Sequence, residues 1–299
     1  MRLAWTIVLV AGLALPAKAE EEQGWSFSGS FNGSSNTDGV VMKAAPVLGY
    51  KFNNHFQTYA GVPFYFVNMS STAMTTSTTP TTSTPSGFVN GIGNAFVGAR
   101  LAVDSESVNY SSTLELTGPT GDKTHGFSTG RATADWTNRF SHRFDSFTPF
   151  GSLGFANTIS DTAFFIRPFT SLGLVTHFEG GATYDISQYV RVGGSAYGIG
   201  AVGDQTIISK VLKRQSLSTS TSGTSASSGR GGNQAQNTNR VFESLTETKV
   251  PASAANDHGV STWFGVSPNS AVDFQIGYSR SMHYDFNTLS FGVRFRVGK

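Results

Sequence analysis

His177 and Glu179 form the most suggestive pair of chemistry-bearing residues, because they lie two positions apart. In an extended strand this spacing puts both side chains on one face, where an imidazole and a carboxylate can relay a proton or assist a hydrolysis. The alternative is a hydrogen-bonded pair that only stabilises its surroundings. We favour this alternative, because no serine nucleophile can be placed beside the pair.

A second candidate pair, His125 and Ser128, lies three positions apart. In a strand this spacing puts the two side chains on opposite faces, so we predict a turn rather than a catalytic pair. Segments 37–39 and 118–122 also have turn composition, and no set of converging oxygens for calcium can be identified in them. The chain has no cysteine, which excludes disulfides and thiolate metal sites. We therefore predict no catalytic residue, no metal, no cofactor and no enzymatic activity.

The elements that must position these residues are strands, because apolar and polar residues alternate with a period of two along most of the chain. In the last segment, Leu289, Phe291 and Phe295 alternate with Ser290 and Arg294. Each such segment is close to the roughly 9 to 11 residues that a tilted strand needs to cross a bilayer. About twelve strands are predicted, at 25–35, 40–51, 55–67, 88–103, 108–118, 129–140, 147–158, 172–186, 190–203, 260–266, 272–279 and 289–298.

The connections between these strands alternate in length. The short ones are 52–54, 104–107, 141–146, 187–189 and 267–271. The intervening ones include all the long stretches, 68–87, 119–128, 159–171 and 204–257, together with the short 36–39 and 282–285. Transmembrane barrels have short periplasmic turns and longer extracellular loops, whereas a soluble β-sandwich, the alternative fold, has no reason to sort its connections in this way. The pattern predicts an all-β, antiparallel up-and-down transmembrane barrel with both termini on the periplasmic side. Pro46, Pro63 and Pro149 fall within the predicted strands and suggest local bulges.

The two ends of the chain and its composition agree with this fold. Residues 1–19 have the layout of a cleaved signal peptide, with a basic start, an apolar stretch and a small-residue cleavage site. The rest, 20–299, is predicted to form the barrel, with long extracellular loops at 68–87 and 204–257. Charged residues make up 13% of the chain, against about 25% in soluble domains. The near balance of charges gives no reason to expect a nucleic-acid partner.

If the apolar residues face lipid, residues of the opposite parity face the barrel lumen, because charges against lipid would cost several kcal/mol each. The residues predicted to line the lumen are Arg100, Glu115, Arg131, Asp135, Arg139, His177, Glu179, Asp185, Arg191, Arg294 and Arg296.

Five of these residues are expected near the periplasmic mouth, namely Arg100, Arg139, Arg191, Arg294 and Arg296. One hypothesis is a cationic constriction that favours anionic or polar solutes. The alternative, which the sequence favours, is that Asp185 and Asp273 pair with these arginines and fill the interior of the barrel.

Residues 89–136 resemble a family of bacterial outer-membrane proteins. Segment 89–98 is similar to its glycine-spaced strand, 119–122 and 128–131 to its P-T-G-D and G-T-G segments, and Asp135-Trp136 to its aspartate-containing strand. This is the phenol-degradation meta-pathway, or transporter-like, family. The resemblance implies an outer-membrane barrel that passes small, often hydrophobic compounds. Asn94 stands where the family commonly has aspartate, so no ion-binding role is carried over to it.

The chain's last strand is also similar to the C-terminal signal of outer-membrane barrels, although it continues past Phe295 to Lys299. The partners expected are outer-membrane lipid, the barrel-assembly machinery through this strand, and a small-molecule solute. The predicted function is passive passage or uptake of small molecules across the bacterial outer membrane. The alternatives are a structural or surface-interaction barrel with a plugged lumen and, third, a lipid-modifying enzyme in the barrel wall.

Overall fold

The computed structural model describes residues 23–36, 39–69, 88–105, 107–123, 125–161, 166, 169–209 and 247–298. The predicted signal peptide, most of the 68–87 loop and the middle of the 204–257 loop lie outside the described residues. Nearly all of the described chain is strand, and none of its helices is long and apolar enough to cross a membrane.

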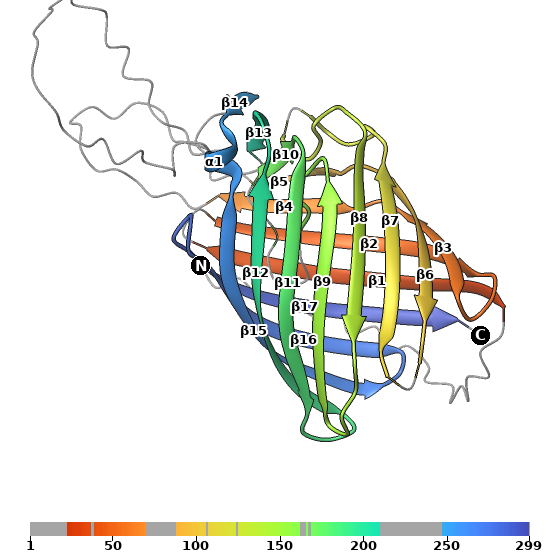
Figure 1. The fold of residues 1–299 in the computed structure, drawn as a ribbon. Coiled ribbons are helices and arrows are strands. Elements are labelled where there is room, and N and C mark those ends of the chain that lie inside the picture. Colours follow the sequence, from red (N-terminus) through yellow and green to blue (C-terminus); the bar gives the residue numbers. More distant parts are fainter. Residues whose placement is uncertain are drawn as a thin grey trace, which may run out of the picture.

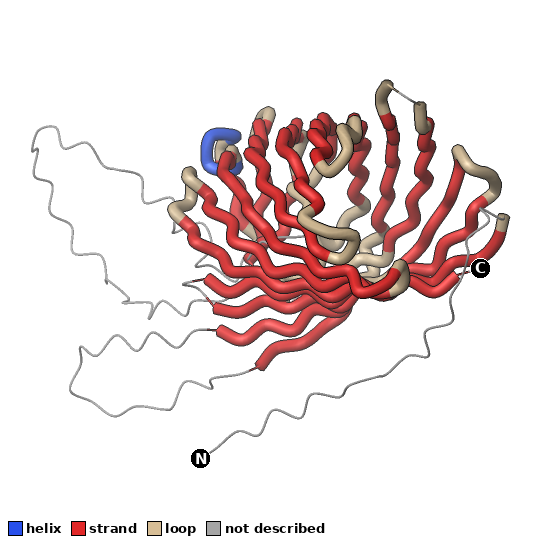
Figure 2. Tube along the Cα trace, turned by 90° about the horizontal axis from the view of Figure 1, so that it is seen from below, coloured by secondary structure: helices blue, strands red, loops and turns tan. Residues whose placement is uncertain are grey.

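The strands form one antiparallel sheet that closes on itself, because β1 pairs with both β2 and β17 (Figures 1 and 2). Two positions in the wall are each occupied by two short strands, so the closed wall has twelve strand positions. In wall order these are β1 (Gly24–Asn36), β2 (Gly39–Lys51), β3 (Phe56–Gly61) with β4 (Phe64–Met69), β6 (Phe96–Val103) with β5 (Phe88–Ile92), β7 (Asn109–Thr117), β8 (Thr133–Ser141), β9 (Phe147–Ala156), β11 (Val175–Asp185), β12 (Val190–Ala201), β15 (Asp257–Asn269), β16 (Val272–Ser281) and β17 (Phe286–Gly298). The predicted twelve-stranded transmembrane barrel is confirmed.

The connections lie at the two ends of the barrel as the sequence predicts. The connections at one end, which we call the short-turn end, contain at most five residues each. Both ends of the described strand wall meet there, since Ser26 pairs with Gly298. The other end, which we call the long-loop end, has all of the longer connections.

Strand pairing explains the three prolines that fall within predicted strands. Pro63 lies between β3 and β4 and interrupts that wall position. Pro46 pairs with Gly29 of β1 on one side and lies, on the other side, between the segments of β2 that pair with β3 and with β4. Pro149 pairs with β11 and lies just beyond the paired part of β8. Each proline therefore lies at a position that is not paired with the neighbouring strand on at least one side, where the missing N–H of proline costs no hydrogen bond. The three prolines do not form bulges.

The outer face of the wall is apolar. Large side chains such as Phe27, Leu114, Phe178 and Ile276 are exposed there, in the alternation that the sequence shows. Aromatic rings gather at the short-turn end, where Trp25, Tyr50, Phe52 and Phe56 contact one another in a continuous row, mostly edge to face. These two features match a lipid-facing band with an aromatic girdle.

The buried apolar residues form two clusters at the long-loop end. The first lies beneath a small sheet of β10 (Phe169–Leu172), β13 (Gln205–Ser209) and β14 (Thr248–Val250), followed by the short α1 (Ala252–Ala255), at the top of Figure 1. The sequence analysis assigned no strand to these three segments. Their pairing partners are distant in sequence, so no local pattern indicates them. The second cluster lies inside the wall around Val41, Tyr65 and Val67.

Candidate functional site: the lumen

The inner face of the wall is polar, and it encloses a cavity of about 450 Å³. This volume lies within the range of sites for small molecules. Strands β3, β7, β8, β9, β11, β12 and β15 contribute to its lining, and so does a segment that folds inward from the long-loop end. The charged and aromatic side chains lining the cavity are those of Tyr59, Glu115, Asp135, Arg139, Phe150, Asp161, His177, Glu179, Tyr197 and Trp263.

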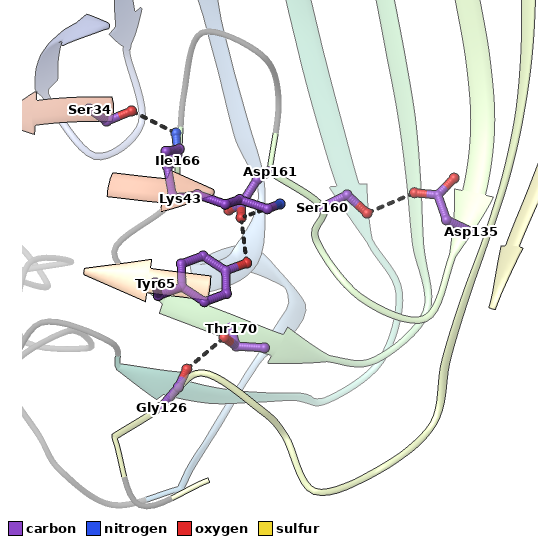
Figure 3. Close-up of polar contacts among 9 residues, drawn as sticks. All are labelled: Ser34, Lys43, Tyr65, Gly126, Asp135, Ser160, Asp161, Ile166 and Thr170. Atoms are coloured by element: carbon purple, nitrogen blue, oxygen red, sulfur yellow. Dashed lines mark hydrogen bonds and ion pairs between the residues drawn. The ribbon is translucent and has the colours of Figure 1, made fainter. Parts of the chain in front are cut away.

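The inward segment is the described part of the β9–β10 connection, residues 157–161 and Ile166, which we call the strap. It leaves the wall at β9, and Ile159 packs in the first apolar cluster. Its other end lies on the far side of the lumen, where Ile166 packs in the second cluster and its N–H donates to Ser34 Oγ of β1 at 2.8 Å. The strap therefore crosses the bore at the long-loop end (Figures 2 and 3).

Polar contacts fix the strap on both sides of the bore. Asp161 accepts hydrogen bonds from Lys43 Nζ at 3.3 Å and from the Tyr65 hydroxyl at 3.1 Å, on β2 and β4. Ser160 donates to Asp135 Oδ2 of β8 at 2.8 Å. The Asp161 side chain is 8% exposed, so this ion pair is largely shielded from water. Figure 3 shows Asp161 and Ser160, adjacent in sequence, directed to these opposite partners.

His177 does not pair with Glu179, the partner considered in the sequence analysis. Its Nε2 lies 3.2 Å from Asp135 Oδ1, two wall positions away, and Thr137 Oγ1 donates to the same carboxylate at 2.7 Å. The imidazole reaches Asp135 by lying across Gly154 of β9, where a methyl group would be 2.3 Å from the ring. His177 thus stabilises the wall, as the non-catalytic alternative held, but with a different partner.

The same arrangement recurs at two other places. Tyr59 of β3 lies across Gly98 of β6, and its hydroxyl donates to Glu115 of β7 at 3.0 Å. Arg191 of β12 lies across Gly265 of β15 and pairs with Asp273 of β16 at 2.6 Å. In each case a glycine leaves room for a long side chain to lie against the wall and contact a carboxylate on the strand beyond.

At the short-turn end, the carboxylates neutralise only one of the five arginines expected there. Asp273 pairs with Arg191, whereas Asp185 pairs with Arg143 of the β8–β9 turn at 3.0 Å. The other four are exposed, and no carboxylate in the described part of the chain lies within ion-pair distance of them. They are Arg100, Arg139, Arg294 and Arg296.

Arg139 is the one of these four arginines that also lines the cavity. Its guanidinium carbon lies 4.2 Å from the centre of the Phe150 ring, and that ring lies 6.2 Å from Trp263 of β15. The wall between the two rings carries Gly181 and Gly193, which pair with Phe150 and Trp263. Arg139, Phe150 and Trp263 therefore form a continuous ledge across the wall from β8 to β15, and all three line the cavity.

Arg131 is not part of the wall, which corrects the sequence analysis. β8 begins at Thr133, two residues later than Arg131. A local turn precedes the strand, in which Gly130 has φ 69° and the Arg131 N–H donates to Thr129 Oγ1. Arg131 lies instead in the loops, 3.9 Å from Glu247.

The segments that carry the family resemblance contact one another. The Ala95 N–H donates to Thr120 Oγ1 at 2.7 Å, and the Gly121 N–H donates to Asn94 Oδ1 at 3.2 Å. A methyl group on Gly121 would lie 2.6 Å from the carbonyl carbon of Gly93, so this close approach requires glycine. The motif residues thus hold the β7–β8 loop against the gap between β5 and β6.

The remaining candidates show no catalytic arrangement. His125 Nδ1 bonds to Asp122, whereas Ser128 is fully buried and its Oγ accepts the Gly130 N–H. No cluster that could hold a metal ion is present among the described residues.

The sequence analysis missed Lys43, Tyr65 and Asp161, which hold the strap. Lys43 gave a usable signal, because it is the only charged residue between 40 and 50 and so requires a partner inside the barrel. Asp161 gave none, since it lies in a polar connection whose path through the lumen depends on tertiary contacts.

Comparison with known proteins yields structural matches only. No family model matches the chain, and no curated protein matches its sequence, so membership of the phenol-degradation family stays a prediction. An outer-membrane channel from Pseudomonas putida F1 is similar in structure, with a TM-score of 0.53 and 10% identity over 95% of this chain and 97% of that one. The NanC porin gives a TM-score of 0.48 at 9% identity, covering 90% of this chain and 100% of that chain. At such identities the likeness concerns the fold.

Proposed function

We propose that the protein is a bacterial outer-membrane channel for small hydrophilic solutes and that it prefers anions at its short-turn end. The observation that carries this proposal is the group of four exposed arginines without a carboxylate partner, which we call the mouth arginines: Arg100, Arg139, Arg294 and Arg296. Charges of one sign on the walls of a narrow passage concentrate counter-ions there.

The composition of the inner face supports hydrophilic rather than oily solutes. The cavity is lined by charged groups and hydroxyls, with Phe150, Trp263, Ile159, Val175 and Ile199 as apolar surface. A wholly apolar solute would have to desolvate these polar groups without replacing their hydrogen bonds, which is costly. A polar solute with an aromatic part suits both kinds of lining.

Ion selectivity in planar bilayers tests this function. In a KCl gradient, the reversal potential of the purified barrel is expected to show a preference for chloride. Replacing all four mouth arginines with glutamine should lower the anion-to-cation permeability ratio by about tenfold, since the charges that concentrate chloride are removed. Arg280→Gln is the matched control, because Arg280 lies at the long-loop rim and pairs with Asp285. A cation preference in the unaltered protein, or no effect of the fourfold substitution, would contradict the proposal.

A barrel with a plugged lumen is the second candidate, and the strap supports it. The strap crosses the bore and is fixed at both sides by Ser160 and Asp161. If the strap closes the passage, the unaltered protein will show no single-channel current, and Asp161→Asn, which releases one side, will open it.

The same proposal includes an outer-membrane location, cleavage of a signal peptide and the expectation that the protein is not an enzyme. The lipid-facing band, the proposed cleavage after residue 19 and the alternating strand β17, with Phe291 and Phe295, fit export and insertion by the barrel-assembly machinery. Membrane fractionation with N-terminal sequencing of the mature chain tests the location and the cleavage. A phospholipid esterase assay tests the expectation that the protein is not an enzyme.

A further inference from the structure

The bore carries carboxylates on the long-loop side of the ledge and arginines on the short-turn side. Toward the long-loop end lie Glu115, Asp135 and the strap's Asp161, and all three line the cavity. Arg139 stands at the floor of the cavity, and Arg294 and Arg296 lie near the short-turn end, where β17 ends. A molecule in the cavity therefore meets negative charge on one side and positive charge on the other.

Most of the cavity's charged groups already have partners within the protein. The Glu115 carboxylate accepts from Tyr59, Asp135 is bonded by His177, Thr137 and Ser160, and Asp161 pairs with Lys43. These contacts hold the wall and the strap, so they are not available to orient a solute without loss of stability.

Arg139 and Glu179 are different. Neither forms an ion pair or side-chain hydrogen bond with another described residue, and the Arg139 guanidinium lies over the face of Phe150. Both face the cavity, and they flank Ser152, because Arg139 and Glu179 each pair with Ser152 from neighbouring strands. Adjacent strands are about 5 Å apart, so the two charged side chains start roughly 10 Å apart. Their charged groups are not within ion-pair distance of each other and both line the cavity, so a small molecule there can bridge them.

An apolar surface adjoins this pair of charges. Phe150 pairs with Gly181, two residues further along β11 than Glu179, and the Trp263 ring lies 6.2 Å from the Phe150 ring. The ledge thus offers two aromatic rings beside one cation and one anion. Aromatic faces bind apolar side chains and also attract ammonium groups.

We propose that the space between the strap and the ledge binds a small zwitterion, an α-amino acid with an aromatic or apolar side chain. Its carboxylate binds the Arg139 guanidinium, its ammonium group binds the Glu179 carboxylate, and its side chain lies on Phe150 and Trp263. This inference rests on the proposed function and names the class of solute that the channel recognises.

Calorimetric titration of the detergent-solubilised, unaltered barrel tests the charge requirement without any substitution. The probes are L-phenylalanine, phenylacetate, which lacks the ammonium group, and 2-phenylethylamine, which lacks the carboxylate. Since each charge-assisted hydrogen bond is lost with one group, L-phenylalanine is expected to bind about tenfold more tightly than either analogue. Equal affinity for the three probes overturns the proposal.

Two substitutions assign the charges to residues. Glu179→Gln should reduce the affinity for L-phenylalanine about tenfold and leave the affinity for phenylacetate unchanged. Arg139→Gln should also reduce the affinity for L-phenylalanine about tenfold, but leave the affinity for 2-phenylethylamine unchanged. Arg280→Gln, which removes an arginine at the long-loop rim, is the matched control and should leave all three affinities unchanged. Heat-modifiable migration on a gel verifies that each variant is a folded barrel. Unchanged binding in both folded variants overturns the site.

Planar-bilayer recordings on the same preparations distinguish a failure of the zwitterion site from a failure of the proposed channel function. A barrel that conducts ions but does not distinguish the three probes overturns the zwitterion site and leaves the channel. A barrel that never conducts overturns the channel function itself.

Discussion

At the long-loop end of the bore the charged side chains are paired and covered, whereas at the short-turn end four arginines are exposed and have no carboxylate partner among the described residues. Asp161, which holds the strap to the wall, is 8% exposed, and its partner Lys43 is 24% exposed. The Arg139, Arg294 and Arg296 side chains are exposed within the same barrel. The two regions have the same strand architecture, so the difference lies in which side chains have a partner.

This difference suggests a division of roles within one wall. Paired charges at the long-loop end stabilise an inward segment that narrows the passage. Arginines at the short-turn end keep a field that acts on mobile ions, because no described carboxylate lies within ion-pair distance of them. Removing an ion pair at the long-loop end tests whether the difference depends on pairing, and altering the Arg191–Asp273 pair at the short-turn end measures its size.

The largest expected effect is that of Asp161→Asn. The substitution preserves shape but leaves Lys43 without its carboxylate in a largely buried position, which should lower the free energy of unfolding by about 3 kcal/mol. Urea unfolding of the barrel in lipid vesicles measures this change. The same variant should show a higher single-channel conductance, because the strap loses its contact with β2 and β4. Asp285→Asn is the control: its carboxylate is 78% exposed, and its loss should cost at most about 1 kcal/mol. Equal losses in the two variants would contradict the comparison.

Gly154→Ala should have a smaller effect. The added methyl group would lie 2.3 Å from the His177 ring and force the ring away from Asp135. We expect a loss of about 2 kcal/mol in the same unfolding measurement, the usual range for an overpacked site. Gly180→Ala provides the matched control on a neighbouring strand, since nothing lies within 4 Å of the position of its added methyl group. If both alanines are tolerated alike, the proposed clearance for His177 is wrong.

The smallest effect concerns the ion pair between Arg191 and Asp273 at the short-turn end. Arg191→Gln leaves Asp273 without its cation, so the anion-to-cation permeability ratio should fall roughly twofold. The double substitution Arg191→Gln with Asp273→Asn removes one charge of each sign and should leave the ratio unchanged. Reversal potentials in a KCl gradient measure both. A double variant with the ratio of Arg191→Gln would show that the pair does not act as a neutral unit.

Local patterns predicted the wall well, because each strand of a membrane barrel must put apolar residues toward lipid at every second position. The same parity placed Glu115, Asp135 and Glu179 on the face that lines the cavity. It failed for Arg131, where a turn ends the alternation before the strand begins. The alternation also does not predict which inward side chains form hydrogen bonds with each other. The two-residue spacing suggested that His177 pairs with Glu179, whereas Gly154 leaves room for His177 to reach Asp135 across a strand.

The sequence by itself determined the strands, their inner and outer faces and the sorting of long and short connections, because these depend on the period of two and on chain direction. Only the tertiary structure decided which charges remain for a solute. The path of the strap to Lys43 and Tyr65, the pairing of Asp185 with Arg143, and the ledge of Arg139, Phe150 and Trp263 all join residues from separate strands or loops. Closing the wall brings them together, and no local spacing encodes that closure.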